Sequence, residues 1–149
     1  MSGVVVIGYG NDLRGDDGAG RRVAEAVAAA GLPGVTVRSV HQLAPEHAAD
    51  VAGRRCAIFV DARLAGAGAQ AGVTVQAVSA RVGDAGLTHH TSPAALLALA
   101  ATLGPPPGDA FVVSIPAGDL GIGTTLSTAT AAAVDAAVDQ VVALCACRP

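Results

Sequence analysis

Apolar positions along the chain alternate between two spacings, and this alternation predicts strands and helices in turn. Apolar runs typical of strands occur at 4–7, 35–40, 56–60, 73–78 and 110–115. Helical spacing or helix-start signals occur at about 17–30, 45–52 and 92–103, and in a last stretch that Ser127 would cap. The pattern predicts one α/β domain over residues 1–149, a three-layer sandwich around a mostly parallel five-stranded sheet with helices on both faces.

Composition agrees with a single apolar core. The 149 residues are 52% hydrophobic, enough for a domain that needs no disulfides. All nine basic residues are scattered arginines and the net charge is −3, which argues against nucleic-acid and anionic membrane partners. No run approaches the roughly 20 continuous apolar residues of a membrane span, and a strand follows the first residues directly. We therefore expect a cytoplasmic protein.

The three cysteines favour the same compartment. Cys56, Cys145 and Cys147 make an odd count without the spacing of a disulfide framework, as expected for reduced thiols. Cys56 begins an apolar strand and is expected in the core. Cys145 and Cys147 lack the Cys-x-x-Cys spacing of zinc and redox sites, so no metal is assigned to them.

The most unusual chemistry follows the first predicted strand, where a Gly-x-Gly turn precedes two acidic residues. Asp16 and Asp17 open the first helix, where free amide groups and the helix dipole favour carboxylates. One carboxylate suffices for a cap, so Asp16 is expected to secure the turn and Asp17 to act in function. The turn only partly matches the dinucleotide fingerprint, because its third glycine comes too late and the carboxylates would repel a pyrophosphate.

Two acidic residues and a histidine are expected at one edge of the sheet. Ligands of open parallel sheets bind beyond the carboxyl ends of the strands, where the strand order reverses. If the second and third strands flank the first, Asp17 and Asp61 share that crevice, and the loop at 79–91 brings His89 or His90 to its rim. Such an incomplete ligand set suits nickel or zinc and leaves room for ligands from another molecule. The alternative role is capping a neighbouring turn for Asp61, and bonding to backbone groups before the helix for either histidine.

Motifs of several familiar enzymes are absent from the sequence. It contains no Gly-x-Ser-x-Gly elbow, no His-Glu-x-x-His helix and no phosphate loop, and it has no lysine. The sequence therefore offers no conventional protease nucleophile.

Three motifs together resemble those of the hydrogenase maturation proteases, the endopeptidases that trim the C-terminus of the nickel-iron hydrogenase large subunit. They are Gly8-x-Gly10-Asn11-x-Leu13-Arg14-x-Asp16-Asp17-Gly18-x-Gly20, Ile58-Phe59-Val60-Asp61-Ala62 and Thr88-His89-His90-x-Ser92-Pro93. The resemblance implies that Asp17, Asp61 and His89 are the catalytic, metal-contacting residues. The spacing to Leu96 favours His89 over the adjacent His90.

The same resemblance implies a substrate and an unusual use of metal. The protein would recognise nickel already inserted in the large-subunit precursor, use it for positioning, and release a short C-terminal peptide. Free protein would hold the metal weakly or not at all. The missing nucleophile leaves an alternative, a checkpoint module that binds the metal centre without cutting. The loops at 62–72 and 79–91 are expected to border the site and to select the partner.

Overall fold

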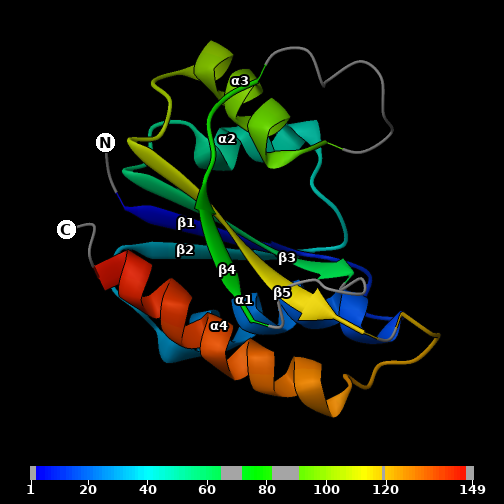
Figure 1. Cartoon of the computed structure of the whole chain (residues 1–149). Helices are drawn as coiled ribbons and strands as arrows, with labels where there is room; N and C mark the ends of the chain where they lie inside the picture. The colour runs from blue at the N-terminus through cyan, green and yellow to red at the C-terminus, as the bar shows by residue number, and fades with distance from the viewer. Residues whose placement is uncertain (1–2, 65–71, 82–90, 119, 147–149) are drawn as a thin grey trace.

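The chain folds into three layers, with α1 and α4 on one face of a sheet and α2 and α3 on the other (Figure 1). The computed structural model describes residues 3–64, 72–81, 91–118 and 120–146. The strands are β1 (Val4–Tyr9), β2 (Val35–Val40), β3 (Cys56–Leu64), β4 (Thr74–Ala77) and β5 (Asp109–Ala117). The helices are α1 (Ala19–Ala30), α2 (Ala48–Val51), α3 (Pro93–Leu103) and α4 (Thr128–Ala146), with short 3-10 turns η1 (Gly15–Gly18) and η2 (Pro45–His47).

The strand order β2-β1-β3-β5-β4 confirms the predicted fold class. All neighbouring strands run parallel except β4, which pairs antiparallel with β5 at the edge. β2 and β3 flank β1, so the order reverses at β1, as the sequence analysis expected. Gly8 pairs with Val60, so Tyr9 and Asp61 come next along the two strands.

Alternate side chains of the central strands build two separate cores. Val4 and Val6 pack with α1 and α4, whereas Val5 and Ile7 pack with α2 and α3. β3 divides its side chains in the same way, with Phe59 on the α2 and α3 side. Because helices cover both faces, the central strands are nearly continuous apolar runs. By this alternation, Asp61 faces the same layer as Phe59.

A glycine lets α1 pack closely over the strand ends. A Cβ added at Gly20 would lie 2.5 Å from the carbonyl oxygen of Val60 and 2.7 Å from that of Tyr9. Only a residue without a side chain allows this approach. The start of α1 is therefore fixed directly beside the last residue of β1 and the neighbouring Val60 of β3.

Several predicted boundaries differ from the structure, and two of the differences concern the acidic residues. The α-helix begins at Ala19 rather than Asp17, because Asp16 and Asp17 occupy the 3-10 turn η1. β3 continues past Asp61 to Leu64, because β5 keeps pairing with it as far as Leu64 and Ala117. Asp61 thus lies within a strand whose other neighbour, β1, ends at Tyr9.

The last helix, α4, begins at Thr128, directly after the predicted cap Ser127. The amide of Thr130 donates to Ser127 Oγ at 3.3 Å. Among the helices that the structure describes, α4 alone is long and apolar enough to cross a membrane, with a mean hydropathy of 1.5. A helix that faces a protein core passes the same test, and α4 buries Val134, Ala137 and Val141 on its core side. Asp135 and Asp139 lie on its exposed side.

Candidate functional site

Asp16 ties the turn after β1 to the segment after β5. Its buried carboxylate accepts hydrogen bonds from the amides of Gly118 (2.9 Å) and Ser127 (2.7 Å) and from Ser127 Oγ (2.8 Å). Charge-assisted bonds of this kind are strong inside a protein. Asp16 therefore has the expected structural role, but it does not cap the first helix, because neither η1 nor α1 has a side-chain cap. It secures the turn by anchoring it to the start of α4.

The turn also encloses Asp17, which is partly buried. Asp17 Oδ2 accepts a hydrogen bond from the amide of Asn11 at 2.8 Å. Gly10 has φ +148°, and a Cβ there would overlap the carbonyl oxygen of Asp17. The backbone at Gly10 and Asn11 therefore fixes where the Asp17 carboxylate lies.

Three polar side chains, Tyr9, Arg63 and Ser114, lie close to Asp61. The Tyr9 hydroxyl donates to its Oδ2 at 3.1 Å. Its Oδ1 is buried and makes no hydrogen bond within the part of the chain that the structure describes. Burial raises the pKa of Asp61, while the Ser114 hydroxyl, Tyr9 and Arg63 oppose that rise. Burial also raises the pKa of Tyr9, and the charge of Asp61 adds to this effect.

The charge of one predicted carboxylate acts on the other. Besides burial, the charge of Asp17 contributes to the raised pKa of Asp61. The structure therefore brings Asp17 and Asp61 to the same edge of the sheet, within electrostatic range. A cation beside them would relieve both the repulsion and the desolvation of Asp61.

Asp61 opens onto a pocket of about 330 Å³ beneath the start of α3. Its lining comes from β3, β4, β5 and the first residues of α3: Asp61, Arg63, Gln76, Ala77, Val78, Ser92, Pro93, Ala94, Val112 and Ser114. Ser92 caps α3 as predicted, accepting a hydrogen bond from the Ala95 amide at 3.1 Å. The pocket gives a ligand access to the carboxylate of Asp61 from the α3 side.

His89 and His90 lie outside the described residues, so the histidine of the predicted set remains a prediction. The described chain resumes at Thr91, immediately before Ser92, which lines the Asp61 pocket. Most of the loops expected to border the site, 65–71 and 82–90, also lie outside the described ranges. Within those ranges, no three His, Cys, Asp or Glu side chains are placed to hold a metal together.

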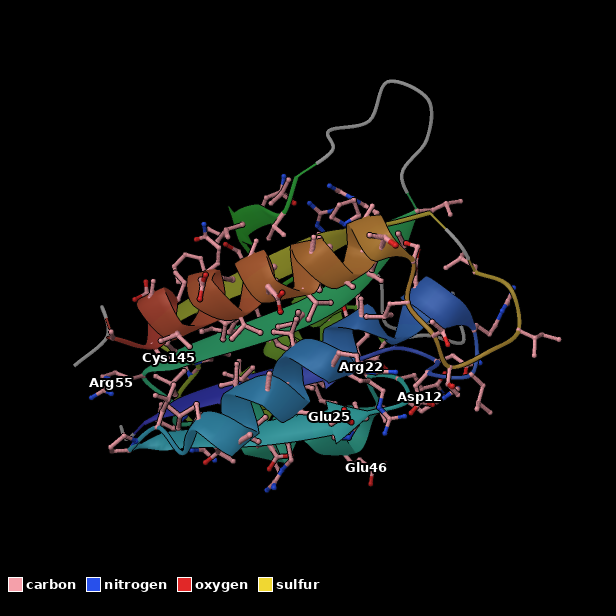
Figure 2. The ribbon with its side chains drawn as sticks, turned by 90° about the horizontal axis from the view of Figure 1, so that it is seen from below. Asp12, Arg22, Glu25, Glu46, Arg55 and Cys145 are labelled. Atoms are coloured by element: carbon pink, nitrogen blue, oxygen red, sulfur yellow. The ribbon has the colours of Figure 1, made fainter. Side chains whose placement is uncertain are left out.

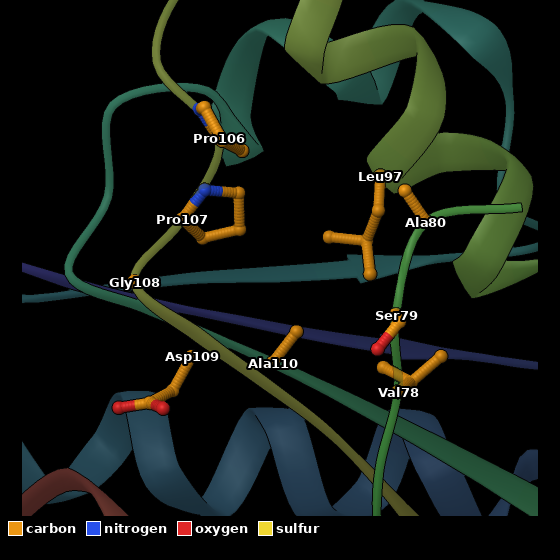
Figure 3. A pocket seen from close by; sticks show the side chains of 9 residues that line it. All are labelled: Val78, Ser79, Ala80, Leu97, Pro106, Pro107, Gly108, Asp109 and Ala110. Atoms are coloured by element: carbon orange, nitrogen blue, oxygen red, sulfur yellow. The ribbon is translucent and has the colours of Figure 1, made fainter.

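A second pocket does not extend this site. It has a volume of about 230 Å³ and lies on the other side of Val78 from Asp61, next to the loop before β5. Leu97 and Ala110 face its interior, whereas the Asp109 carboxylate points away from it (Figure 3). The pocket is therefore mainly apolar and offers no ionisable group for chemistry.

The described cysteines are also remote from the carboxylates. Cys56 is fully buried in the core, as predicted. Figure 2 shows Cys145 near the end of α4, at the opposite end of the molecule from Asp12 and the turn after β1. Burial raises the pKa of the Cys145 thiol, which makes it less reactive. Cys147 lies outside the described residues.

Tyr9 and Ser114 are the two members of the site that the sequence analysis missed. Tyr9 is the only tyrosine in the chain and ends an otherwise aliphatic strand. Ser114 is the one hydroxyl in the apolar run 110–115, in register with Asp61. Each is a polar interruption at the carboxyl end of a buried strand, and that pattern could have identified both.

Comparison with solved structures defines the class of protein that has this fold. Three of the matches are hydrogenase maturation endopeptidases. The first, HybD from E. coli, shows 22% identity with a TM-score of 0.75 and covers 95% of this chain and 91% of its own. The second, a hydrogenase 2 maturation peptidase from a Thaumarchaeota archaeon, shows 27% identity with a TM-score of 0.69 and covers 95% and 97%. The third, HycI from Thermococcus kodakarensis, shows 21% identity with a TM-score of 0.75 and covers 96% and 92%.

The chain therefore has the fold of the hydrogenase maturation endopeptidases along almost its whole length, which confirms the resemblance drawn from the three motifs. No protein-family model matches the sequence, and no curated protein matches it either.

Proposed function

We propose that this protein is a cytoplasmic endopeptidase of hydrogenase maturation, which removes a short C-terminal peptide from the nickel-loaded large-subunit precursor of a nickel-iron hydrogenase. The observation that carries the proposal is the placement of Asp17 and Asp61 at one edge of a sheet with the fold of such endopeptidases. Similar proteins named hydrogenase maturation proteases support the activity and the class of substrate.

In this proposal, Asp17, Asp61 and His89 contact nickel that the precursor carries. Asp61 offers Oδ1, which is buried and without a hydrogen bond in the described chain, while Tyr9 holds Oδ2. The backbone amide of Asn11 donates a hydrogen bond to the Asp17 carboxylate and fixes its position. Nickel held in this way would act as a Lewis acid, which polarises the scissile carbonyl or activates a water. This chemistry needs no nucleophilic side chain.

The test follows the mass of the precursor during incubation with the protein. We expect loss of a C-terminal peptide from the nickel-loaded precursor and no change in the nickel-free one. Asp17→Asn and Asp61→Asn should each lower the rate at least about 100-fold if the carboxylates hold the metal. Asp12→Asn is the matched control, because Asp12 lies in the same turn but pairs with Arg21 at the surface. His89→Ala and His90→Ala identify the histidine.

Two results would contradict the proposal. One is an unchanged mass for the nickel-loaded precursor. The other is equal shortening by the wild type and by the variant that combines Asp17→Asn with Asp61→Asn. A stable complex with the loaded precursor, without release of a peptide, would instead support the checkpoint module, which the lack of a conventional nucleophile favours.

A further inference from the structure

Three large apolar side chains are exposed at the edge of the sheet that carries the carboxylates, and one of them, Leu64, is 63% exposed at the end of β3. Ile122 is 99% exposed and Leu13 is 62% exposed. Leu13 belongs to the turn after β1, and Ile122 to the segment between β5 and α4. Single exposed apolar residues are common on protein surfaces, so their significance depends on how they are held.

Backbone hydrogen bonds hold Leu13 and Ile122 next to each other. The amide of Gly123 donates to the carbonyl of Leu13, and the amide of Gly15 donates to the carbonyl of Gly123, both at 2.8 Å. These bonds form a parallel bridge between Arg14 and Gly123. Leu13 and Ile122 each come one residue before the bridge, so they lie side by side. We call the pair Leu13 and Ile122 the edge patch.

Side chains from the turn after β1 and from α1 fix the segment that carries Ile122. Arg14 Nε donates to the carbonyl of Leu120 at 3.2 Å, and Arg22 donates to that of Thr124 at 2.6 Å. Asp16 binds the same segment on both sides, at Gly118 and Ser127. The edge patch is thus presented by ordered backbone, which lowers the entropy lost when a partner binds.

The edge patch is continuous with the carboxylate site. Asn11 links the two: its Oδ1 accepts a hydrogen bond from the Leu13 amide at 3.0 Å, and its own amide donates to Asp17. The edge patch is therefore joined to Asp17 through Asn11 and the Arg14–Gly123 bridge. Arg14, which follows Leu13 and is exposed, adds a positive charge next to the patch.

We propose that the edge patch is the docking surface for the folded body of the large-subunit precursor, as distinct from its C-terminal tail. The inference rests on the proposed function. The patch lies beside the carboxylates on the outside of the turn, whereas Asp61 opens into a separate pocket under α3, which suits the tail. With its two apolar side chains beside Arg14, the edge patch would select a precursor face that is apolar and carries acidic residues.

The experiment measures the dissociation constant of the nickel-loaded precursor and its rate of shortening at saturation. Ile122→Ser and Leu13→Ser should each raise the dissociation constant about fivefold, and the double variant more than about tenfold, because apolar area is no longer buried on binding. The rate at saturation should stay within about twofold of wild type, because no contact of Asp17 or Asp61 with nickel is lost. Leu103→Ser is the matched control, since Leu103 is 59% exposed at the end of α3.

The outcomes separate this inference from the proposed function. A wild type that neither binds nor shortens the precursor overturns both. A wild type that shortens the precursor, with an Ile122→Ser variant that binds it as tightly, overturns the docking surface alone. Ile122 decides the matter even if Leu13→Ser disturbs the turn, because its side chain has almost no intramolecular contact to lose. Melting temperatures verify that each variant is folded.

Discussion

The hydroxyl of Tyr9 at the end of β1 donates a hydrogen bond to Asp61 Oδ2 on β3, at 3.1 Å. The bond joins two neighbouring strands at the point where the strand order reverses. It leaves Asp61 Oδ1 as the oxygen without a hydrogen-bond partner in the described chain. Tyr9 therefore orients Asp61 and opposes the rise of its pKa that burial causes.

Replacing Tyr9 should change the pH dependence of processing. Tyr9→Phe removes the donor at a cost of about 1 kcal/mol in the free energy of unfolding. It also removes an interaction that lowers the pKa of Asp61, so that pKa rises further. If ionised Asp61 is required, the acid limb of the rate of precursor shortening moves to higher pH. Superimposable pH profiles for the two proteins would contradict this role.

Removing the charge of Asp61 should stabilise the fold at neutral pH. Because the pKa of Asp61 is raised in the folded state, its protonated form adds stability below the unfolded pKa of about 4, and this stability is lost as pH rises through the folded value. We expect Asp61→Asn to raise Tm by about 2–4 °C at neutral pH, with a smaller difference in acid. Asp135→Asn, at an exposed position on α4, is the control. A constant difference between the two pH values would count against the effect.

The carboxylate of Asp16 should be far more important for stability than that of Asp12. Asp16→Asn leaves one of its hydrogen-bond donors, from Gly118 or Ser127, facing an amide instead of an oxygen. We expect a loss of about 2–3 kcal/mol in the free energy of unfolding, measured by urea denaturation. Asp12→Asn breaks only a surface pair with Arg21 and should cost less than about 1 kcal/mol. Equal midpoints for the two variants would refute the anchoring role of Asp16.

Adding a methyl group at Gly10 should disturb both the fold and the site. In Gly10→Ala the new Cβ would overlap the carbonyl oxygen of Asp17, at a backbone φ of +148°. We expect a loss of more than about 2 kcal/mol and slow processing of the precursor, because the turn must move away from Asp17. Gly72→Ala is the matched control, since no atom of the described residues lies within 4 Å of its added Cβ. A Gly10→Ala variant as stable as that control would show that the turn tolerates the change.

Local signals in the sequence predicted most of the elements. Alternation in 35–40 predicted β2 with its observed bounds, and the Ser92-Pro93 pair predicted the start of α3. Both signals act within a few residues, through side-chain periodicity and through a cap that bonds the first turn. The doubled acid after Gly10 likewise predicted an anchor and a second carboxylate, and Asp16 is that anchor.

The sequence by itself determined the fold class, the two carboxylates and the edge of the sheet on which they lie. Tertiary structure alone decided what surrounds them. The extension of β3 past Asp61 depends on pairing with β5, some 50 residues away, and the surroundings of Asp61 depend on Tyr9 and Ser114 from two other strands. Alternation along a strand fixes which face a side chain occupies. Which residue of a distant strand lies beside it depends on the order in which the strands pair, and no local pattern encodes that order.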